Sequence, residues 1–266
     1  MSISMVVKYL KLTLLVQKIN VLSAMEYRTS FIYQILGMIV NNAGLLYVWV
    51  IFFKKFPSIN GWGFQETMLL YGISTVSYSL VWFFLFGSLH ISEYIVKGQL
   101  DNYLLQPKNI LWNISVSKTD ISALGDMSFG FLVLLFSKYF SFQNIFVFII
   151  IGLLSAIIFF NLIVILQSIT FYFGNFEAVA EQFINALLGF TLYPQTIYSG
   201  ALRIIIYTII PAAFISLIPV ELIKHFDIWK FLLMLFVTIV TFALANLIFN
   251  KGIRRYESGN LINVKM

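Results

Sequence analysis

Long apolar stretches alternate with short polar segments along this 266-residue chain. A helix that crosses the hydrocarbon core of a bilayer needs about 20 mostly apolar residues. The pattern therefore predicts an all-α integral membrane protein with a single transmembrane domain over residues 1–266. Seven stretches approach the spanning length: 31–53, 67–89, 121–139, 145–172, 183–198, 201–219 and 231–249.

The stretch 201–219 is the weakest of these predicted spans. Arg203 lies near its start, Pro211 interrupts its middle, Pro219 ends it and Pro194 precedes it. Proline removes a backbone donor and breaks a helix, and broken backbone at membrane depth needs protein or water around it. We therefore predict that residues 199–222 form a re-entrant or interfacial helix pair on the outer side. Six helices then cross the membrane; seven spans with an external C-terminus are the alternative.

Positive residues gather at both ends of the sequence. Because cytoplasmic loops carry an excess of Lys and Arg, we predict that both termini are cytoplasmic. The six-span arrangement then places eleven Lys and Arg residues inside and six outside. Residues 1–29 alternate lysines with apolar residues, which is typical of an amphipathic helix in the inner interface. A solvated helix with snorkelling lysines differs little from this physically.

Composition agrees with a membrane protein and excludes other classes. Hydrophobic residues make up 60% of the chain and charged residues 11%, compared with about 25% charged in a soluble domain. The net charge of +6 is scattered in ones and twos, without the basic stripe that a duplex needs, so no nucleic-acid partner is expected. Cysteine is absent, which excludes disulfides and thiolate metal sites.

The sequence carries little catalytic chemistry. No G-x-x-x-x-G-K-[ST] loop occurs, so another chain must handle any ATP. The two histidines, His90 and His225, lie near span ends and outside an H-E-x-x-H motif, which favours packing over metal binding. No G-x-S-x-G motif and no mid-span pair of aspartates is present. We expect neither an enzyme nor a metal site.

Some polar side chains fall inside the predicted spans. They could line a translocation path, or they could form hydrogen bonds between helices, which is common in membrane bundles. Asp126, in the third predicted span, could bind a proton or be satisfied by the interface and the helix dipole. With so few other intramembrane charges, a proton-coupled carrier is disfavoured. The path candidates are Asn41, Asn42, Ser74, Tyr78, Asn161 and Gln167.

The stretch GQLDNYLLQP lies between the second and third predicted spans. Gly98 can end the second span in a left-handed turn, Asp101 can cap a new short helix, and Pro107 can stop it. Leu104 and Leu105 would then either dip into the lipid surface or fill a groove in a partner protein. The periodicity alone leaves both interpretations open.

Four stretches together carry a family resemblance: SEYIVKGQLDNYLLQPKN, NKGIRRYESGN, AMEYRTSFIYQILG and IIPAAFISLIPVELI. The chain resembles the membrane subunit of an ABC type-2 exporter over most of its length. The resemblance implies that residues 1–29 form a connecting helix and that residues 199–222 form the outer re-entrant pair. It also implies a coupling helix in the cytoplasmic segment 91–118 that docks on a nucleotide-binding ATPase subunit through Gly98, Leu100, Asp101, Tyr103, Leu104, Leu105 and Pro107.

The same resemblance implies an assembly of two permease and two ATPase subunits in a bacterial cell membrane. ATP and Mg would be bound by the ATPase subunits, and this chain would hold no cofactor. The sequence analysis thus predicts the permease subunit of an ATP-driven exporter; aromatic-rich spans suit an amphipathic drug, lipid or peptide, although lipid-facing packing explains them too. Two alternatives are a proton- or ion-coupled carrier, which would need a carboxylate such as Asp126, and a non-transporting membrane scaffold.

Overall fold

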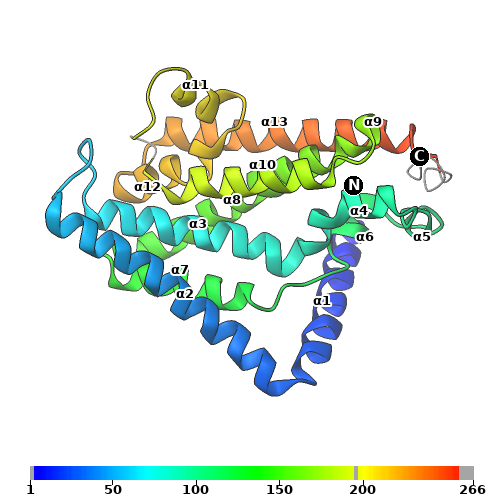
Figure 1. Cartoon of the computed structure of the whole chain (residues 1–266), viewed down its shortest axis with the longest axis horizontal. Coiled ribbons are helices and arrows are strands. Elements are labelled where there is room, and N and C mark those ends of the chain that lie inside the picture. Colours follow the sequence, from blue (N-terminus) through cyan, green and yellow to red (C-terminus); the bar gives the residue numbers. More distant parts are fainter. Residues whose placement is uncertain (1–2, 195–196, 258–266) are drawn as a thin grey trace.

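The computed structural model describes residues 3–194 and 197–257, and in these residues the fold is all-helical, as predicted. Figure 1 shows a bundle whose helices run along the long axis of the molecule. Its members are α3 (Phe64–Leu85), α7 (Ala123–Phe136), α8 (Phe142–Ser168), α10 (Glu177–Leu192) and α13 (Ile228–Ile253).

The two ends of the bundle differ in what they carry (Figure 1). One end, called the α5 end below, holds the end of α13 and five short helices. The other, called the α12 end, holds the loop 56–63 and the helices α11 and α12. The short helices of the α5 end are η1 (Phe86–His90), α4 (Ile91–Val96), α5 (Asp101–Leu104), α6 (Ile110–Ser115) and α9 (Thr170–Phe173).

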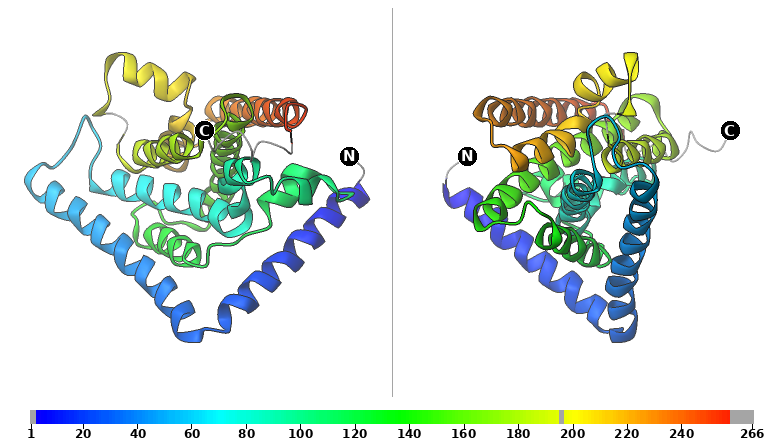
Figure 2. Two further views of the ribbon diagram at one scale, coloured as in Figure 1. Left: turned by 45° about the vertical axis from the view of Figure 1, so that its right-hand side comes forward. Right: turned by 90° about the vertical axis from the view of Figure 1, so that its left-hand side faces the viewer.

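The first two helices form an open V beside the bundle (Figures 1 and 2). The first helix, α1 (Ile3–Met25), starts at the α5 end and runs away from it, and the chain turns at Tyr27. The second helix, α2 (Arg28–Lys55), then runs to the α12 end and packs against α7 and α3. The first helix therefore lies across the direction of the bundle.

Among the described residues, four helical segments are long and apolar enough to cross a membrane, or five if one bent pair counts as a span. The six spans predicted from the sequence are thus matched only in part by helix length and composition. The four segments are Arg28–Lys55, Phe64–Val96, Phe142–Phe173 and Ile228–Ile253.

Two predicted spans are shorter or shifted. The third, predicted over 121–139, is the 14-residue α7, which rises only about 21 Å. The fifth, predicted over 183–198, begins six residues earlier at Glu177 and ends at Leu192, two residues before Pro194. Acidic residues suit the positive end of the helix dipole, and a residue that precedes proline disfavours the helical conformation. Hydropathy alone placed both boundaries wrongly.

The weak sixth stretch is a broken helix pair. It consists of α11 (Gly200–Thr208), the turn η3 (Ala212–Phe214) and α12 (Leu217–Lys224), and the two parts are bent by 62°. Pro211 lies at the bend and Pro219 in the first turn of α12, where a proline is tolerated. A pair bent in this way is either a broken span or a re-entrant loop.

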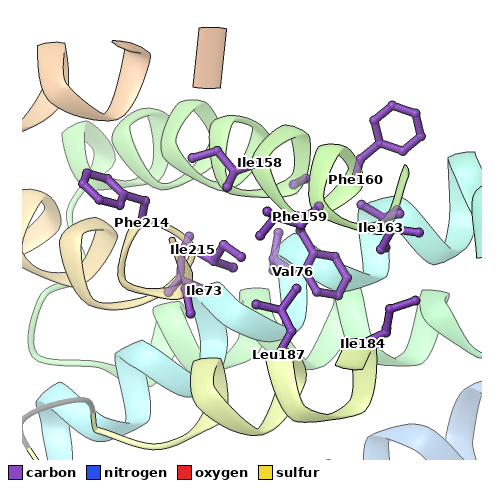
Figure 3. Packing of buried hydrophobic residues seen from close by; sticks show 14 of the residues in the cluster. Ile73, Val76, Ile158, Phe159, Phe160, Ile163, Ile184, Leu187, Phe214 and Ile215 are labelled. Carbon is purple, nitrogen blue, oxygen red and sulfur yellow. The ribbon is translucent and has the colours of Figure 1, made fainter. Parts of the chain in front are cut away.

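The core of the bundle is built around α8 (Figure 3). Ile158, Phe159 and Ile163 of α8 pack with Ile73 of α3 and Leu187 of α10. On its other side α3 packs closely on α7 through two glycines. A Cβ atom added to Gly130 would lie 2.7 Å from the carbonyl oxygen of Gly72, so the two backbones approach as helices with small residues do in membranes.

Candidate functional site: the coupling segment and the polar spans

The α5 helix is positioned by a glycine turn. Gly98 has a φ of +68°, the left-handed conformation predicted for it, and the chain reverses there after α4. Leu100 then enters the core with 0% exposure and anchors the start of α5. Leu104 is 37% exposed and Leu105 is 86% exposed, and Pro107 follows in the exposed turn. Buried and exposed leucines therefore alternate around a helix of a single turn.

The predicted helix cap at Asp101 is wrong. The N-cap position of α5 is Leu100, no side chain caps the helix, and Asp101 is its first residue. Its carboxylate lies instead beside the hydroxyl of Tyr256, just beyond the end of α13. Burial, together with this carboxylate, raises the pKa of Tyr256 to about 12. The raised pKa reflects the position of this hydroxyl beside the acid, where α5 meets the end of α13.

Tyr256 belongs to a closely packed contact between α9 and the end of α13, called the junction below. Its ring lies 6.5 Å from that of Phe171 in α9, and Phe171 also contacts Phe249. A Cβ atom added to Gly252 would lie 2.3 Å from Cδ2 of Phe171, so only glycine fits there. The junction joins α5 to the end of α13, across 155 positions of sequence.

Aromatic packing and a cation hold the other side of α5. The ring of Tyr103 lies 5.3 Å from that of Tyr94 in α4, and the Lys118 ammonium lies 5.3 Å from the centre of the Tyr94 ring. Lys118 also faces Glu93 at 3.7 Å. Tyr103 therefore helps to fix α5 on the bundle and is not part of its exposed surface.

The α1 helix grips the segment after α5 with its polar side chains. The backbone N–H of Asn109 donates to the Tyr9 hydroxyl at 2.9 Å, and the indole N–H of Trp112 donates to the Thr13 hydroxyl at 3.1 Å. Gln17 donates to the carbonyl oxygen of Phe84 at 3.1 Å. The prediction that residues 1–29 form an amphipathic interfacial helix stays a prediction, because exposed leucines such as Leu14 lie on α1 together with exposed lysines such as Lys11.

Five of the six path candidates lie between helices of this chain. Asn42, Ser74, Asn161 and Gln167 are buried, and Tyr78 is partly buried. The Ser74 hydroxyl donates to the carbonyl oxygen of Thr191 in α10 at 2.8 Å. The Asn161 amide donates to the Thr241 hydroxyl in α13 at 3.1 Å, and the Gln167 side chain accepts from the backbone N–H of Ser92 at 3.0 Å.

Asn42 and Tyr78 meet the buried carboxylate of Asp126. The Asn42 amide donates to Asp126 at 2.5 Å, and the Tyr78 hydroxyl lies at 3.5 Å. The Tyr71 hydroxyl donates to the other end of the Asn42 amide at 2.7 Å. This polar cluster joins α2, α3 and α7, and Asp126 is only 3% exposed, so the expected contact with the membrane interface is wrong. Each of the five enclosed path candidates thus forms a hydrogen bond to another helix of this chain.

Asn41 is the exposed exception, and it marks a polar face that the sequence analysis missed. Gln34 and Asn41 lie seven residues apart on the exposed side of α2, and Gly37 and Gly44 between and beyond them face open space. A similar face on α10 carries exposed Gln182 and Asn185. Seven-residue spacing of polar and small residues within an apolar helix was the signal for the α2 face.

At the α12 end, one acid joins three elements. Glu66 of α3 accepts from the Lys138 ammonium at 2.9 Å, faces Lys224 of α12 at 3.8 Å and accepts from the Tyr139 hydroxyl. The nearby α11 carries exposed Arg203, whose guanidinium lies 6.0 Å from the centre of the Tyr207 ring. Among residues 3–194 and 197–257, no group of three or more His, Asp and Glu residues could hold a metal ion.

Fold and site together define a multi-pass helical membrane protein. In the described part of the chain, the polar side chains hold helices together or form surfaces. A family model described as ABC-2 family transporter protein matches residues 39–259. The chain therefore belongs to the ABC-2 transporter family and is the membrane component of such a transporter. This family typically lacks an ATPase domain and generally pairs with an ATPase subunit. Searches of curated proteins and of solved structures gave no match.

Proposed function

We propose that this chain is the permease subunit of an ATP-driven exporter, energised by a separate nucleotide-binding subunit that docks over α5. The observation that carries the proposal is the arrangement of the leucines that precede and follow this short helix. Leu100 is fully buried, whereas Leu105 is 86% exposed on a segment that lies beyond the spans. Amphipathic helices commonly lay such apolar residues into a groove of a partner. ATP and Mg would be held by that partner.

Three contacts would carry movement of α5 into the membrane. Asp101 beside Tyr256 links it to α13, and Leu100 links it to the core. The hydrogen bond between Asn109 and Tyr9 links the following turn to α1. The coupling segment 91–118 is thus attached to both ends of the chain. A push on α5 would be passed to an interfacial helix and to the last span together.

We further propose six crossings with the α5 end in the cytoplasm. In Figure 1 the helices α2, α3, α7, α8, α10 and α13 run alternately between the two ends, although α7 and α10 are short. A bilayer thins locally around short helices at modest cost. The segment 199–222, with α11 and α12 at the outer end, would then be re-entrant.

The exposed polar faces of α2 and α10 are the proposed meeting place with a second permease copy. Amide side chains such as Asn41 and Asn185 are costly in lipid, and small residues allow close approach of helices. The two helices converge at Trp49 and Tyr193, whose rings lie 5.7 Å apart. An amphipathic drug, lipid or peptide would pass along this polar surface between the copies. This route keeps Asn41 of the predicted path residues and leaves out buried ones such as Asn161 and Gln167.

Co-purification tests the proposal directly. The tagged chain would be extracted from its native membrane in mild detergent, and the co-purifying proteins identified by mass spectrometry. We expect a protein with the G-x-x-x-x-G-K-[ST] loop, whose ATP hydrolysis rises when the chain is added. A carrier would instead transport in vesicles without ATP, at a rate that follows the proton gradient. A scaffold would show no turnover under either condition.

A further inference from the structure

An apolar groove of about 540 Å³ runs along the flank of α13. Its walls come from α8, from α10 at Phe183 and Leu187, and from the α13 residues between Phe236 and Ile248. Residues Tyr207–Pro211, from the end of α11 into the bend that follows, also line it. Its volume lies within the range of about 300–1,000 Å³ that small-molecule sites show.

The groove has the length of one membrane leaflet. Twelve residue steps separate Phe236 from Ile248, a rise of about 18 Å along the helix, and half of a bilayer core is about 15 Å. A straight apolar chain fits this shape better than a compact ligand does. Because both flanking helices expose apolar side chains to the membrane, acyl chains are the apolar material that surrounds the groove.

Positive side chains stand where the groove reaches the α5 end. Lys251 is exposed and follows Ile248 by three residues, which places it on the same face of α13. The Tyr172 hydroxyl donates to the carbonyl oxygen of Ile248 at 3.3 Å, and the Arg255 guanidinium lies 4.9 Å from the centre of the Tyr172 ring. The groove therefore ends at a pair of cations.

The acidic residues of α10 do not oppose this charge. Glu181 precedes Phe183 by two residues, which is about 200° around the helix axis. Glu177 lies one turn before Glu181, on the same side of α10. Glu181 thus projects from the side of α10 away from Phe183, whereas Glu177 lies about 80° around the axis from Leu187.

Asp101, beside Tyr256, and Glu257 are further acids near Arg255. Among the described residues neither Lys251 nor Arg255 forms a salt bridge with any acid, so both cations can attract an anion.

We propose that the groove holds one acyl chain of an anionic phospholipid whose phosphate lies at Lys251 and Arg255. Basic pockets between transmembrane helices are typical sites for anionic headgroups on the cytoplasmic side. The lipid is a resident of the bilayer and not the exported cargo, and it would fasten α10 and α13 beside the bend at Pro211. If the orientation proposed above is correct, this is the cytoplasmic leaflet. The lipid site itself requires only that the chain is embedded in a membrane.

Native mass spectrometry tests this site without any ATPase subunit. The purified chain would be reconstituted in vesicles of phosphatidylglycerol and phosphatidylcholine, extracted, and its retained lipids counted. We expect Lys251→Gln with Arg255→Gln to lower the preference for phosphatidylglycerol about thirtyfold, from about 1 kcal/mol for each cation. Lys251→Gln alone should lower it about fivefold, and this variant spares the contact with Tyr172.

The matched control is Lys54→Gln with Lys55→Gln, which removes the same charge at the α12 end. An equal loss of phosphatidylglycerol in this control would overturn the proposal, because general surface charge would then explain retention. Leu244→Trp fills the groove and should remove one lipid per chain. An unchanged lipid count with this variant would also overturn the proposal. A loss of the dimer without a loss of lipid would overturn it too, because the groove would then be the contact with a second copy of the chain. None of these results bears on whether an ATPase docks over α5.

Discussion

Replacing Leu105 with alanine is the sharpest perturbation of the proposed docking surface. Leu105 is 86% exposed, at the position that follows α5, so truncation there removes little packing from the chain itself. Leu100, five residues earlier, is fully buried, and its truncation would damage the fold. The two leucines of this one segment therefore separate docking from folding.

The expected magnitude follows from the exposed fractions. Leucine to alanine removes three carbon groups, each contributing about 0.8 kcal/mol when it is buried. Scaled by the 86% exposure of Leu105, this is about 2 kcal/mol of docking free energy, or roughly thirtyfold in affinity. For Leu104, 37% exposed, the same arithmetic gives about 0.9 kcal/mol, roughly fourfold. Leu105 thus carries most of the expected effect of the pair.

The assay compares retention of the ATPase subunit by each variant in detergent, together with ATP hydrolysis stimulated by the permease. Wild type, Leu104→Ala and Leu105→Ala should form a graded series in both measurements. Leu135→Ala is the matched control, because Leu135 is 49% exposed and lies in the last turn of α7, a helix that ends toward the α12 end and away from α5. Insertion and thermal stability of all three variants should stay close to wild type.

Leu100→Ala gives the opposite pattern. Truncating a buried leucine to alanine leaves a cavity and costs about 2–5 kcal/mol of stability. This variant should therefore lose thermal stability, and any loss of ATPase retention would follow from the damaged fold. If Leu105→Ala retained the ATPase and stimulated it normally, the docking interpretation would be refuted. The leucine would then be an anchor in the membrane surface, and its truncation would lower only the affinity of the chain for lipid.

Three further predictions concern the remaining contacts. Asp101→Asn should weaken the link to Tyr256, lowering stimulated ATP hydrolysis severalfold while the ATPase stays bound; loss of binding would show instead that the acid belongs to the docking surface. Asp126→Asn is nearly isosteric, and its side-chain oxygen can still accept the bond from Asn42, so ATP-driven export should stay largely intact; complete loss of export, with wild-type transport at a rate that follows the proton gradient, would favour a carrier. Cysteines at Ser199 and His225, both exposed, should react with an impermeant maleimide from outside; reaction of only one would make the bent pair a true span.

Local sequence signals predicted the short-range features of the fold. Gly98 occupies the left-handed turn and Pro211 the bend, because each residue type restricts its own backbone. The run of apolar residues located the long helices within a few positions. Where the signal was a gradual change in hydropathy, as at Glu177 and Ser137, the predicted helix ends were off by several residues.

The sequence predicted the exposed leucines of the candidate site, Leu104 and Leu105, and missed the contacts that attach α5 to the rest of the chain. Leu105 could be recognised as an apolar residue in a polar segment, but nothing near Asp101 in the sequence indicated that its carboxylate lies beside Tyr256. The sequence also did not indicate which side of α2 faces the bundle. Asn41 and Asn42 are neighbours, yet one is exposed and the other bonds Asp126.

The sequence by itself thus determined that this is a helical membrane protein and where its helices are interrupted, and the resemblance of several stretches indicated the ABC-2 family. The membrane class follows from residue composition, and the interruptions follow from local backbone restriction. Only the tertiary structure decided which polar residues are enclosed, that the end of α13 contacts α5, and that α8, α10 and α13 leave a groove. The reason is physical: the local sequence indicates where along the chain an apolar helix lies, whereas the rotation of that helix about its axis is set by packing against helices distant in sequence.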